Sequence, residues 1–270
     1  MTSGLAILAG DGQLPVQLHQ AVPDALCVVF EGMAHQLNAK NIQICQFEKL
    51  NSLFELLKHH EISHVVMAGA MSRPQLDPAK FDAFMQNIAP DFIKVLQKGD
   101  DTVLRYVITL FEDQGFSVIA PQDVALELTL PEGMTVGAPP DAILSDLAYA
   151  DQILHQMSAL DIGQGVVVEG GHVLGIETLQ GTEALLDFVA TTQSSLRSSQ
   201  GGVLVKRPKA HQDMRVDVPT IGPQTIQQVA NAGLSGLVIS PENVLVLERE
   251  KTIFLAKSLG IFIWVQEPKL

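Results

Sequence analysis

Short apolar runs alternate with longer amphipathic segments through the first half of the chain. Residues 5–8, 25–30, 64–68 and 117–120 are apolar and bounded by turn-forming residues, which predicts strands. Apolar positions recur at helical spacing over residues 15–21, 48–59, 78–98 and 102–114. Alternation of strands and helices is typical of a parallel sheet covered by helices. The pattern therefore predicts a Rossmann-like N-terminal domain over residues 1–131.

The second half follows a break in this pattern. Residues 131–140, PEGMTVGAPP, are rich in Pro and Gly and lack periodicity, which predicts a linker over residues 132–140. Beyond it, helices are predicted over 141–159 and 224–232. Strands 164–169 and 172–177 are predicted to form a hairpin about Gly170-Gly171. The fold class is thus α/β with two α/β domains, the second a mixed α/β domain over residues 141–270.

Scarce positive charges gather in one stretch of the second half. The chain has 17 Lys+Arg against 30 Asp+Glu, yet four cations fall within ten residues, and two acids lie among or beside them. The cations are Lys206, Arg207, Lys209 and Arg215, and the acids are Asp213 and Asp217. A concentration of cations in an acidic chain indicates a site for an anionic group.

The backbone conformation expected for this stretch decides how its charges are presented. Pro219 favours an extended residue before it, so a strand is predicted over 213–218. At period two, Asp213, Arg215 and Asp217 then share one face. Such a row could bind an anion through the guanidinium and hold a divalent cation or a water through the acids. An edge strand with solvated, mutually paired charges is the structural alternative.

A glycine-rich turn follows the first predicted strand. Gly10-Asp11-Gly12 lies between a strand and a helix, where a backbone can wrap the phosphates of a nucleotide. Pro15 stands where a dinucleotide fingerprint has its third glycine, and the Lys of a P-loop is missing, which disfavours an NAD-dependent oxidoreductase. A tight structural turn remains the alternative.

Two further segments carry polar residues that could act in a site or only in the fold. Asp100 and Asp101 precede a predicted helix, so they could cap it or join Arg105 in a metal or substrate site. Gln164 lies between two glycines, which would let a ligand approach the backbone closely. Glu169 and Glu177 are predicted to be exposed ends of apolar strands.

Composition narrows the class of protein. A net charge of −13 argues against nucleic acid and against broad attachment to an anionic membrane. Cys27 and Cys45 lie in apolar surroundings, which indicates free thiols. No apolar stretch reaches the roughly 18 residues of a transmembrane helix, and the N-terminus lacks the pattern of a signal peptide. No His/Cys arrangement of zinc type is present.

Several segments together resemble a known family. They are residues 8–15 (LAGDGQLP), 99–105 (GDDTVLR), 161–166 (DIGQGV), 181–182 (GT), the run KRPKAHQDMRVDVPTIGP over 206–223, and 260–265 (GIFIWV). In this order and spacing the chain resembles the LpxI-type UDP-2,3-diacylglucosamine pyrophosphatases of lipid A biosynthesis in Gram-negative bacteria. One departure is Asp187-Phe188, where the family pattern has a basic residue, and it bears on whether that helix binds phosphate.

The resemblance implies an activity and a set of residues. It implies hydrolysis of UDP-2,3-diacylglucosamine to 2,3-diacylglucosamine 1-phosphate (lipid X) and UMP by water attack on the α-phosphorus, with the C-terminal domain catalytic. Asp217, Asp213 and Arg215 are the expected catalytic residues, and Asp217 and Asp213 the expected ligands of Mg²⁺. The expected substrate-binding residues are Gly10, Asp11, Gly12, Gly69, Asp100, Asp101, Gln164, Gly165, Thr182, Lys206, Gln212 and Thr220.

The same resemblance implies a setting and leaves an alternative. The expected partner is a lipid-linked UDP-sugar, bound by a cytoplasmic protein with transient contact to the inner membrane, and a homo-oligomer stays open. The alternative is a non-catalytic protein that binds a nucleotide sugar or lipid phosphate. The paired acids favour a hydrolase, because a pure anion binder would do better without them.

Overall fold

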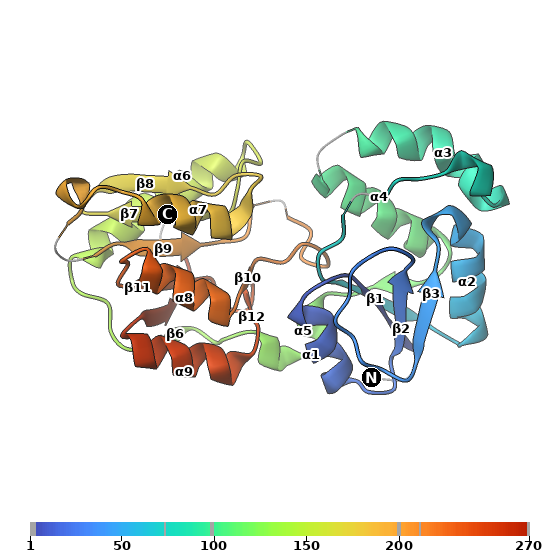
Figure 1. The fold of residues 1–270 in the computed structure, drawn as a ribbon, viewed down its shortest axis with the longest axis horizontal. Coiled ribbons are helices and arrows are strands. Elements are labelled where there is room, and N and C mark those ends of the chain that lie inside the picture. Colours follow the sequence, from blue (N-terminus) through green and yellow to red (C-terminus); the bar gives the residue numbers. More distant parts are fainter. Residues whose placement is uncertain (1–3, 73, 98–99, 199–200, 211, 269–270) are drawn as a thin grey trace. The chain divides into compact units, whose positions relative to one another are not determined.

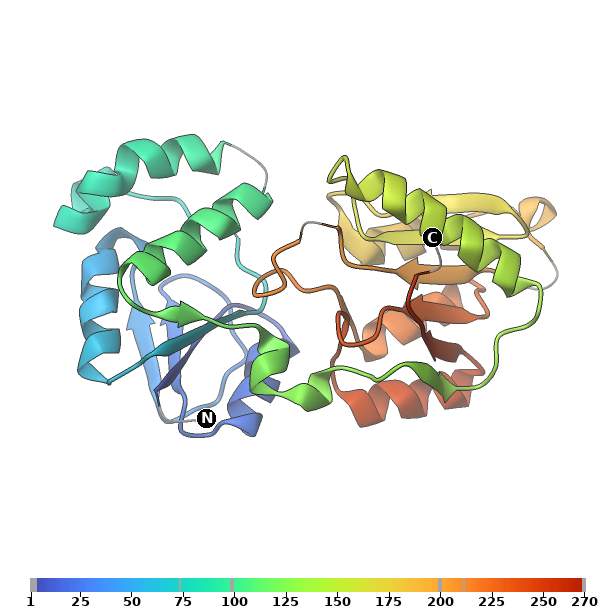
Figure 2. The same cartoon turned by 180° about the vertical axis from the view of Figure 1, so that it is seen from behind.

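The computed structural model describes residues 4–72, 74–97, 100–198, 201–210 and 212–268. The chain forms two compact units, which Figures 1 and 2 show from opposite sides. The first comprises Met1–Leu126 together with Asp213–Asp217, and the second comprises Glu127–Gln212 and Val218–Leu270. A short loop from the second half of the sequence therefore belongs to the first unit.

The first unit is a parallel sheet with helices on both faces. Its strands are in the order β3-β2-β1-β4-β5, and every neighbouring pair is parallel. The strands are β1 (Leu5–Ala9), β2 (Leu26–Phe30), β3 (Ile42–Cys45), β4 (His64–Ala68) and β5 (Ser117–Val118). The helices are α1 (Gln13–Ala21), α2 (Leu50–His59), α3 (Ala83–Leu96), α4 (Asp100–Asp113) and α5 (Pro121–Val124), with 3₁₀ turns η1 (Phe47–Lys49) and η2 (Pro78–Lys80).

Alternation along the strands divides the core of this unit. Ala6 and Leu8 of β1 pack with apolar side chains of α2, α3 and α4. In this part of the core the rings of Phe54 and Phe111 pack edge to face, with 5.3 Å between their centroids. Helices α1 and α5 contact each other, and they contact β1 and β4 respectively. The predicted Rossmann-like sheet is confirmed.

The second unit contains a mixed sheet of order β6-β13-β11-β9-β7-β8 and a separate parallel pair, β10 and β12. The strands are β6 (Gly133–Val136), β7 (Gly165–Glu169), β8 (His172–Ile176), β9 (Val203–Lys206), β10 (Thr220–Ile221), β11 (Gly236–Ile239), β12 (Leu245–Val246) and β13 (Phe262–Val265). The helices are α6 (Ile143–Ser158), α7 (Gly181–Ala190), α8 (Pro223–Asn231) and α9 (Arg249–Leu259), with 3₁₀ turns η3 (Leu126–Leu128) and η4 (Ser194–Leu196). Strands β9, β11 and β13 are mutually parallel, whereas β6, β7 and β8 pair antiparallel.

Three layers make up the second unit. Helix α6 packs on one face of the sheet, against Val203 and Val205 of β9 among others. Helices α7, α8 and α9 cover the other face, where Leu204 points. Figure 1 shows these three helices in front of the sheet, and Figure 2 shows α6 from the opposite side. Lys206 follows the same alternation and faces the α7 side, which places a cation at the end of a buried strand.

The structure corrects three expectations. Residues 213–217 form turns and bends, so the predicted strand with Asp213, Arg215 and Asp217 on one face is wrong. The segment 132–140 contains β6, which pairs with β13, so it is an edge of the second sheet rather than a linker. Glu169 and Glu177 are 2% and 6% exposed, so both are buried strand ends.

Other expectations match the structure. Strand β4 has the predicted bounds, and the hairpin of β7 and β8 turns at Gly170-Gly171 as predicted. Both cysteines are free thiols, Cys27 buried and Cys45 half-buried. In the part of the chain that the structure describes, no helix combines the length and apolar character needed to cross a bilayer.

Candidate active site

The predicted nucleotide turn lies at the point where the strand order of the first sheet reverses. From β1 the chain proceeds to β2 on one side, while β4, the other neighbour of β1, leads to β5 on the opposite side. Gly10 and Asp11 follow β1 and Gly69 follows β4, so these residues meet at the carboxyl ends of adjacent parallel strands. Open α/β sheets bind ligands at such a switch point. The topology therefore favours a ligand site at the Gly10–Gly12 turn.

Two of the three predicted glycines in this region, Gly10 and Gly69, allow two loops to approach closely. The Gly10 amide donates to Ala68 O at 2.8 Å, and Asp11 pairs with Ala70 in both directions at 2.9 Å. A Cβ at Gly10 would lie 2.3 Å from Ala70 O. A Cβ at Gly69, where φ is +87°, would lie 2.5 Å from Asp11 O. Gly12 has φ +100° but faces open space, so its backbone conformation alone requires glycine.

Asp11 links this turn to a distant residue. Its Oδ1 accepts from the Gly12 amide at 2.8 Å and from Gln36 Nε2 at 3.1 Å, and Gln36 Oε1 accepts from Gln13 Nε2 at 2.6 Å. This polar group stands at the start of α1, whose first turn carries no side-chain cap. The positive end of the helix dipole favours an anionic ligand group there. The sequence analysis did not find Gln36, because it lies in a segment without a motif.

The 213–217 loop is fixed by an arginine held between two acids. Arg215 donates from Nε to Asp213 Oδ1 at 2.9 Å and from Nη2 to Asp213 Oδ2 at 2.7 Å. Its Nη1 donates to Glu112 of α4 at 2.5 Å. These bonds use three of the five N–H groups of the guanidinium. The expected cation is thus present, but it first of all joins its own loop to α4.

This arrangement fixes the charge states of the pair. Hydrogen bonds from Arg215 hold the pKa of Asp213 below its usual range, with Arg105 adding a smaller attraction. The same bonds raise the pKa of Arg215. Asp213 is therefore ionised at neutral pH, the state in which a carboxylate accepts hydrogen bonds or binds a cation.

Asp217 closes the same loop in an unusual backbone conformation. Its φ is +52°, and the residue is exposed. Val216 beside it is 3% exposed and belongs to the core of the first unit. Glu61 and Asp161 share the positive φ, but they follow the ends of α2 and α6, where this conformation commonly terminates helices. Glu242 and Glu248 share it as well, in the turn after β11 and just before α9. Asp217 terminates no helix, and an uncommon conformation in a loop is a reason to consider a functional role.

Lys206, Thr182 and Glu177 form a buried lysine cluster in the second unit. Lys206 Nζ donates to Thr182 Oγ1 at 2.6 Å and lies 3.9 Å from Glu177 Oε2. Thr182 Oγ1 in turn donates to Glu177 Oε2 at 3.1 Å. The ammonium group thus meets the second residue of α7 at the end of β9. Two predicted substrate-binding residues are brought together, and Glu177 is a third member that the sequence analysis placed at the surface.

The glycines around Gln164 allow Glu177 to approach. A Cβ at Gly163 would lie 2.1 Å from Glu177 O, and one at Gly165 would lie 2.4 Å from Glu177 Oε2. Within the described residues, Gln164 Oε1 is buried without a hydrogen-bond partner. A donor from a ligand would satisfy this acceptor, which supports the predicted role of Gln164.

A buried arginine cluster lies next to the lysine, on the other face of the sheet. Arg207 Nε donates to Asp151 Oδ1 of α6 at 3.0 Å, and Nη1 donates to Ser240 Oγ at 3.4 Å and to the carbonyl of Gln266. Arg207, Ser240 and Gln266 are the residues that directly follow β9, β11 and β13. Burial lowers the pKa of Arg207, and Asp151 opposes this effect. The sequence analysis missed Asp151, although an acid one turn from both Leu147 and Leu154 on an apolar helix face was a signal.

The remaining predicted residues are placed separately. Gln212 Oε1 accepts from the Lys209 amide at 3.0 Å, and Thr220 Oγ1 donates to Val218 O at 2.8 Å. Asp100 and Asp101 occupy the first turn of α4, and their side chains, like the whole of Gly99, lie outside the described part of the structure.

Comparison with known proteins bears on the same residues. A family model described as the LpxI N-terminal domain matches residues 4–128, and one described as the LpxI C-terminal domain matches residues 131–264. A curated relative, UDP-2,3-diacylglucosamine pyrophosphatase LpxI of Caulobacter vibrioides, is 35% identical over 277 aligned positions that cover 98% of each chain. The chain belongs to the LpxI family. This membership confirms the predicted family.

Proposed function

We propose that the protein hydrolyses UDP-2,3-diacylglucosamine to 2,3-diacylglucosamine 1-phosphate and UMP, in the synthesis of lipid A. The observation that carries this proposal is the similarity to an LpxI pyrophosphatase along 98% of both chains. The geometry agrees, because the chain combines a switch-point turn suited to a nucleotide with buried cations at strand ends. A cytoplasmic location with access to the inner membrane belongs to the same proposal.

The chain's own residues have separable tasks in this reaction. The Gly10–Gly12 turn and Asp11 bind the UDP moiety, since backbone amides and a helix N-terminus suit phosphate oxygens. In the second unit, Lys206 offers positive charge to a phosphate group, and Thr182 orients the ammonium through its 2.6 Å hydrogen bond. Arg215 holds Asp213 and fixes the loop on α4. Asp217 orients the attacking water and accepts its proton.

Mg²⁺ is part of the proposal, and the donor chemistry fits it. Asp217 and Asp213 offer carboxylate oxygens, which Mg²⁺ prefers, and Asp213 is held ionised. Among the described side chains, no group of three or more His, Cys, Asp or Glu is close enough to hold a metal. Mg²⁺ commonly uses one or two carboxylates and completes its shell with water and substrate phosphates. When bound, the ion would neutralise charge on the diphosphate.

The test is a product analysis in labelled water. Purified protein is incubated with UDP-2,3-diacylglucosamine in ¹⁸O-water, with Mg²⁺ or with EDTA, and products are identified by mass spectrometry. We expect Mg²⁺-dependent release of UMP that carries the label. Label in the lipid phosphate alone would refute attack on the α-phosphorus, and full activity in EDTA would remove the metal from the proposal.

A variant pair tests the role of Asp217. Asp217→Ala should lower kcat by about 10²–10⁴ while substrate binding is retained, because an orienting group is lost and the cations remain. Glu61→Ala is the matched control, since Glu61 is also an exposed acid with positive φ in the first unit. Equal activities of the two variants would place the chemistry elsewhere. Binding without any turnover by the wild-type protein would instead favour the non-catalytic alternative.

A further inference from the structure

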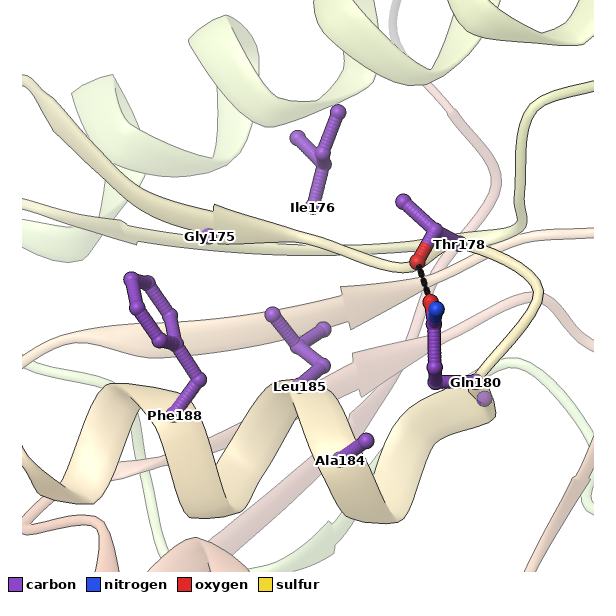
Figure 3. A pocket seen from close by; sticks show the side chains of 8 residues that line it. Gly175, Ile176, Thr178, Gln180, Ala184, Leu185 and Phe188 are labelled. Atoms are coloured by element: carbon purple, nitrogen blue, oxygen red, sulfur yellow. Dashed lines mark hydrogen bonds between the residues drawn. The ribbon is translucent and has the colours of Figure 1, made fainter.

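A groove of about 410 Å³ lies between helix α7 and strand β8 at the edge of the second sheet. Figure 3 shows Leu185 and Phe188 rising from α7 toward the strand, with Thr178 and Gln180 hydrogen-bonded at the opposite end. The residues that line the groove are Gly175, Ile176, Thr178, Gln180, Gly181, Ala184, Leu185 and Phe188. None of these eight side chains is charged, so the lining is suited to an uncharged, largely apolar occupant.

The shape of the groove follows from small residues on both sides. Gly181, Ala184, Leu185 and Phe188 recur at spacings of three and four, so they share one face of α7. Leu185 is buried, whereas Phe188 is 64% exposed. A Cβ at Gly175 would lie 2.6 Å from Leu185 Cδ1, so a larger residue there would displace the Leu185 side chain. The result is a track along α7 with Leu185 buried against β8 and an exposed Phe188 on the same face.

Two apolar side chains at the groove are strongly exposed. Phe188, which lines it, is 64% exposed, and Leu179, between the lining residues Thr178 and Gln180, is 89% exposed. Ile176 points away from α7 in Figure 3, so its side chain adds nothing to this apolar surface. Exposed apolar side chains grouped at a groove are typical of a binding surface.

The groove and the buried lysine cluster are adjacent at the start of α7. Gly181, which lines the groove, directly precedes Thr182, whose hydroxyl accepts from Lys206. A phosphate bound by Lys206 and Thr182 would place the attached sugar, and the acyl chains that it carries, near the start of the groove.

We infer that this groove binds one fatty acyl chain of the lipid substrate. The inference rests on the proposed function for the identity of the lipid. Helix α7 has 10 residues and is about 15 Å long, a length that matches an extended chain. A volume of about 410 Å³ falls in the range of small-ligand sites. A second copy of the chain paired along the outer edge of β8 would leave the groove unfilled. An acyl chain would fill it, so we prefer the acyl chain as the occupant.

Chain-length dependence of turnover tests the inference. Two variants change the groove, Ala184→Trp by filling it and Phe188→Ser by removing one apolar wall. Phe254→Ser is the matched control, because Phe254 is 73% exposed on α9 outside the groove. The substrates are UDP-2,3-diacylglucosamine with long acyl chains and the analogue with acetyl groups, each measured in detergent micelles.

For the long-chain substrate, kcat/KM of the groove variants should fall by about tenfold, mainly because KM rises. This is the size of effect that one methylene group has in a hydrophobic pocket. Their kcat/KM for the acetyl analogue should stay at the wild-type value, and Phe254→Ser should match wild type on both. Equal losses on both substrates, or no loss on either, would overturn the inference.

A second measurement separates this inference from the proposed function. If the wild-type protein hydrolyses neither substrate, the proposed function fails, and a photoreactive diazirine at the end of an acyl chain still reports where the chain binds. Adducts on peptides from β8 and α7 would support the groove, and adducts confined to other peptides would overturn it. The groove variants could instead change the mass in sedimentation or the flotation with vesicles, while the dependence on chain length stays as in wild type. This result would assign the surface to a second copy or to a membrane, and it would overturn the acyl assignment.

Discussion

Replacing Asp151 with alanine removes the carboxylate that faces a buried arginine. Arg207 and Asp151 side chains are 5% and 1% exposed, and the Nε–Oδ1 distance is 3.0 Å. An arginine side chain stays protonated in proteins, so Asp151→Ala leaves a buried charge in the second unit without its hydrogen-bonded carboxylate. The remaining hydrogen-bond partners of Arg207, Ser240 and the Gln266 carbonyl, are neutral, and Glu267 adds only a weaker electrostatic attraction.

The size of the effect follows from this burial. Removing one partner of a buried ion pair typically costs about 3–5 kcal/mol, against a total stability of about 5–15 kcal/mol for a domain. With roughly 2–4 °C per kcal/mol for a domain of this size class, the midpoint should fall by about 6–20 °C. By comparison, the loss of a solvent-exposed ion pair costs only about 0–1 kcal/mol.

The assay uses the single tryptophan of the chain. Trp264 lies in β13 of the second unit and packs against its α6-side core, so its fluorescence reports the unfolding of that unit. Thermal unfolding is recorded for wild type, Asp151→Ala and Lys251→Ala. Lys251 pairs with Glu248 in the same unit at 2.8 Å, but its side chain is 66% exposed, which makes it the matched control.

Two results would refute the reasoning. Equal midpoints for Asp151→Ala and Lys251→Ala would show that the Arg207 charge is solvated in the variant. A double variant, Asp151→Ala with Arg207→Leu, should recover part of the lost stability because it removes the unpaired charge. If the double variant is less stable than Asp151→Ala alone, the loss comes from packing and not from charge.

Three further predictions address the first unit. Gly12→Ala should lower the free energy of unfolding in urea by about 1–3 kcal/mol, because only its backbone conformation would be strained. Gly69→Ala should lower it more, because its Cβ would also lie 2.5 Å from Asp11 O. Equal losses would contradict the close approach of the loops. The pKa of Asp213 in the folded state lies below the roughly 3.9 of an unfolded Asp. Its pairing with Arg215 therefore stabilises the fold fully above about pH 5, and this stability is lost as the pH falls through the folded-state pKa. The difference in melting temperature between wild type and Asp213→Asn should vanish on acidification, and a difference that widens would contradict the direction of the shift. Burial raises the pKa of Cys27 to about 11, so this thiol should react with iodoacetamide at pH 8 only after unfolding. Rapid labelling of the Cys27 peptide in the native protein would refute its burial.

Much of the fold follows from local patterns, and the misses have physical causes. Strand β4 is apolar and central, so its pattern is unambiguous. Strand β3, Ile42–Cys45, was missed because it is four residues long, half-buried and at the sheet edge. Strand β6 was missed because Gly and Pro surround it, and its pairing with β13 depends on residues far along the chain.

The sequence supplied candidate site residues, but it did not predict how they are arranged in the structure. The pattern of residues 213–217 suits a strand, yet Arg215 binds Glu112, which is 103 positions away in the sequence. Likewise, Glu177 is buried because Gly163 and Gly165 leave room for it and Lys206 lies nearby. Such contacts are tertiary, and no local pattern encodes them.

The discontinuity of the first unit has a consequence for biosynthesis. Val216 fills part of a core otherwise made from residues of the first 126, and Asp213 and Arg215 anchor the same loop to α4. During translation, that core stays incomplete until residue 217 has left the ribosome, by which time most of the second unit has been synthesised. We therefore expect an isolated fragment ending at Leu126 to expose a hydrophobic gap and to require chaperones or to aggregate. Splitting the gene at the boundary between the family domains would produce two pieces, of which the first lacks a part of its own interior.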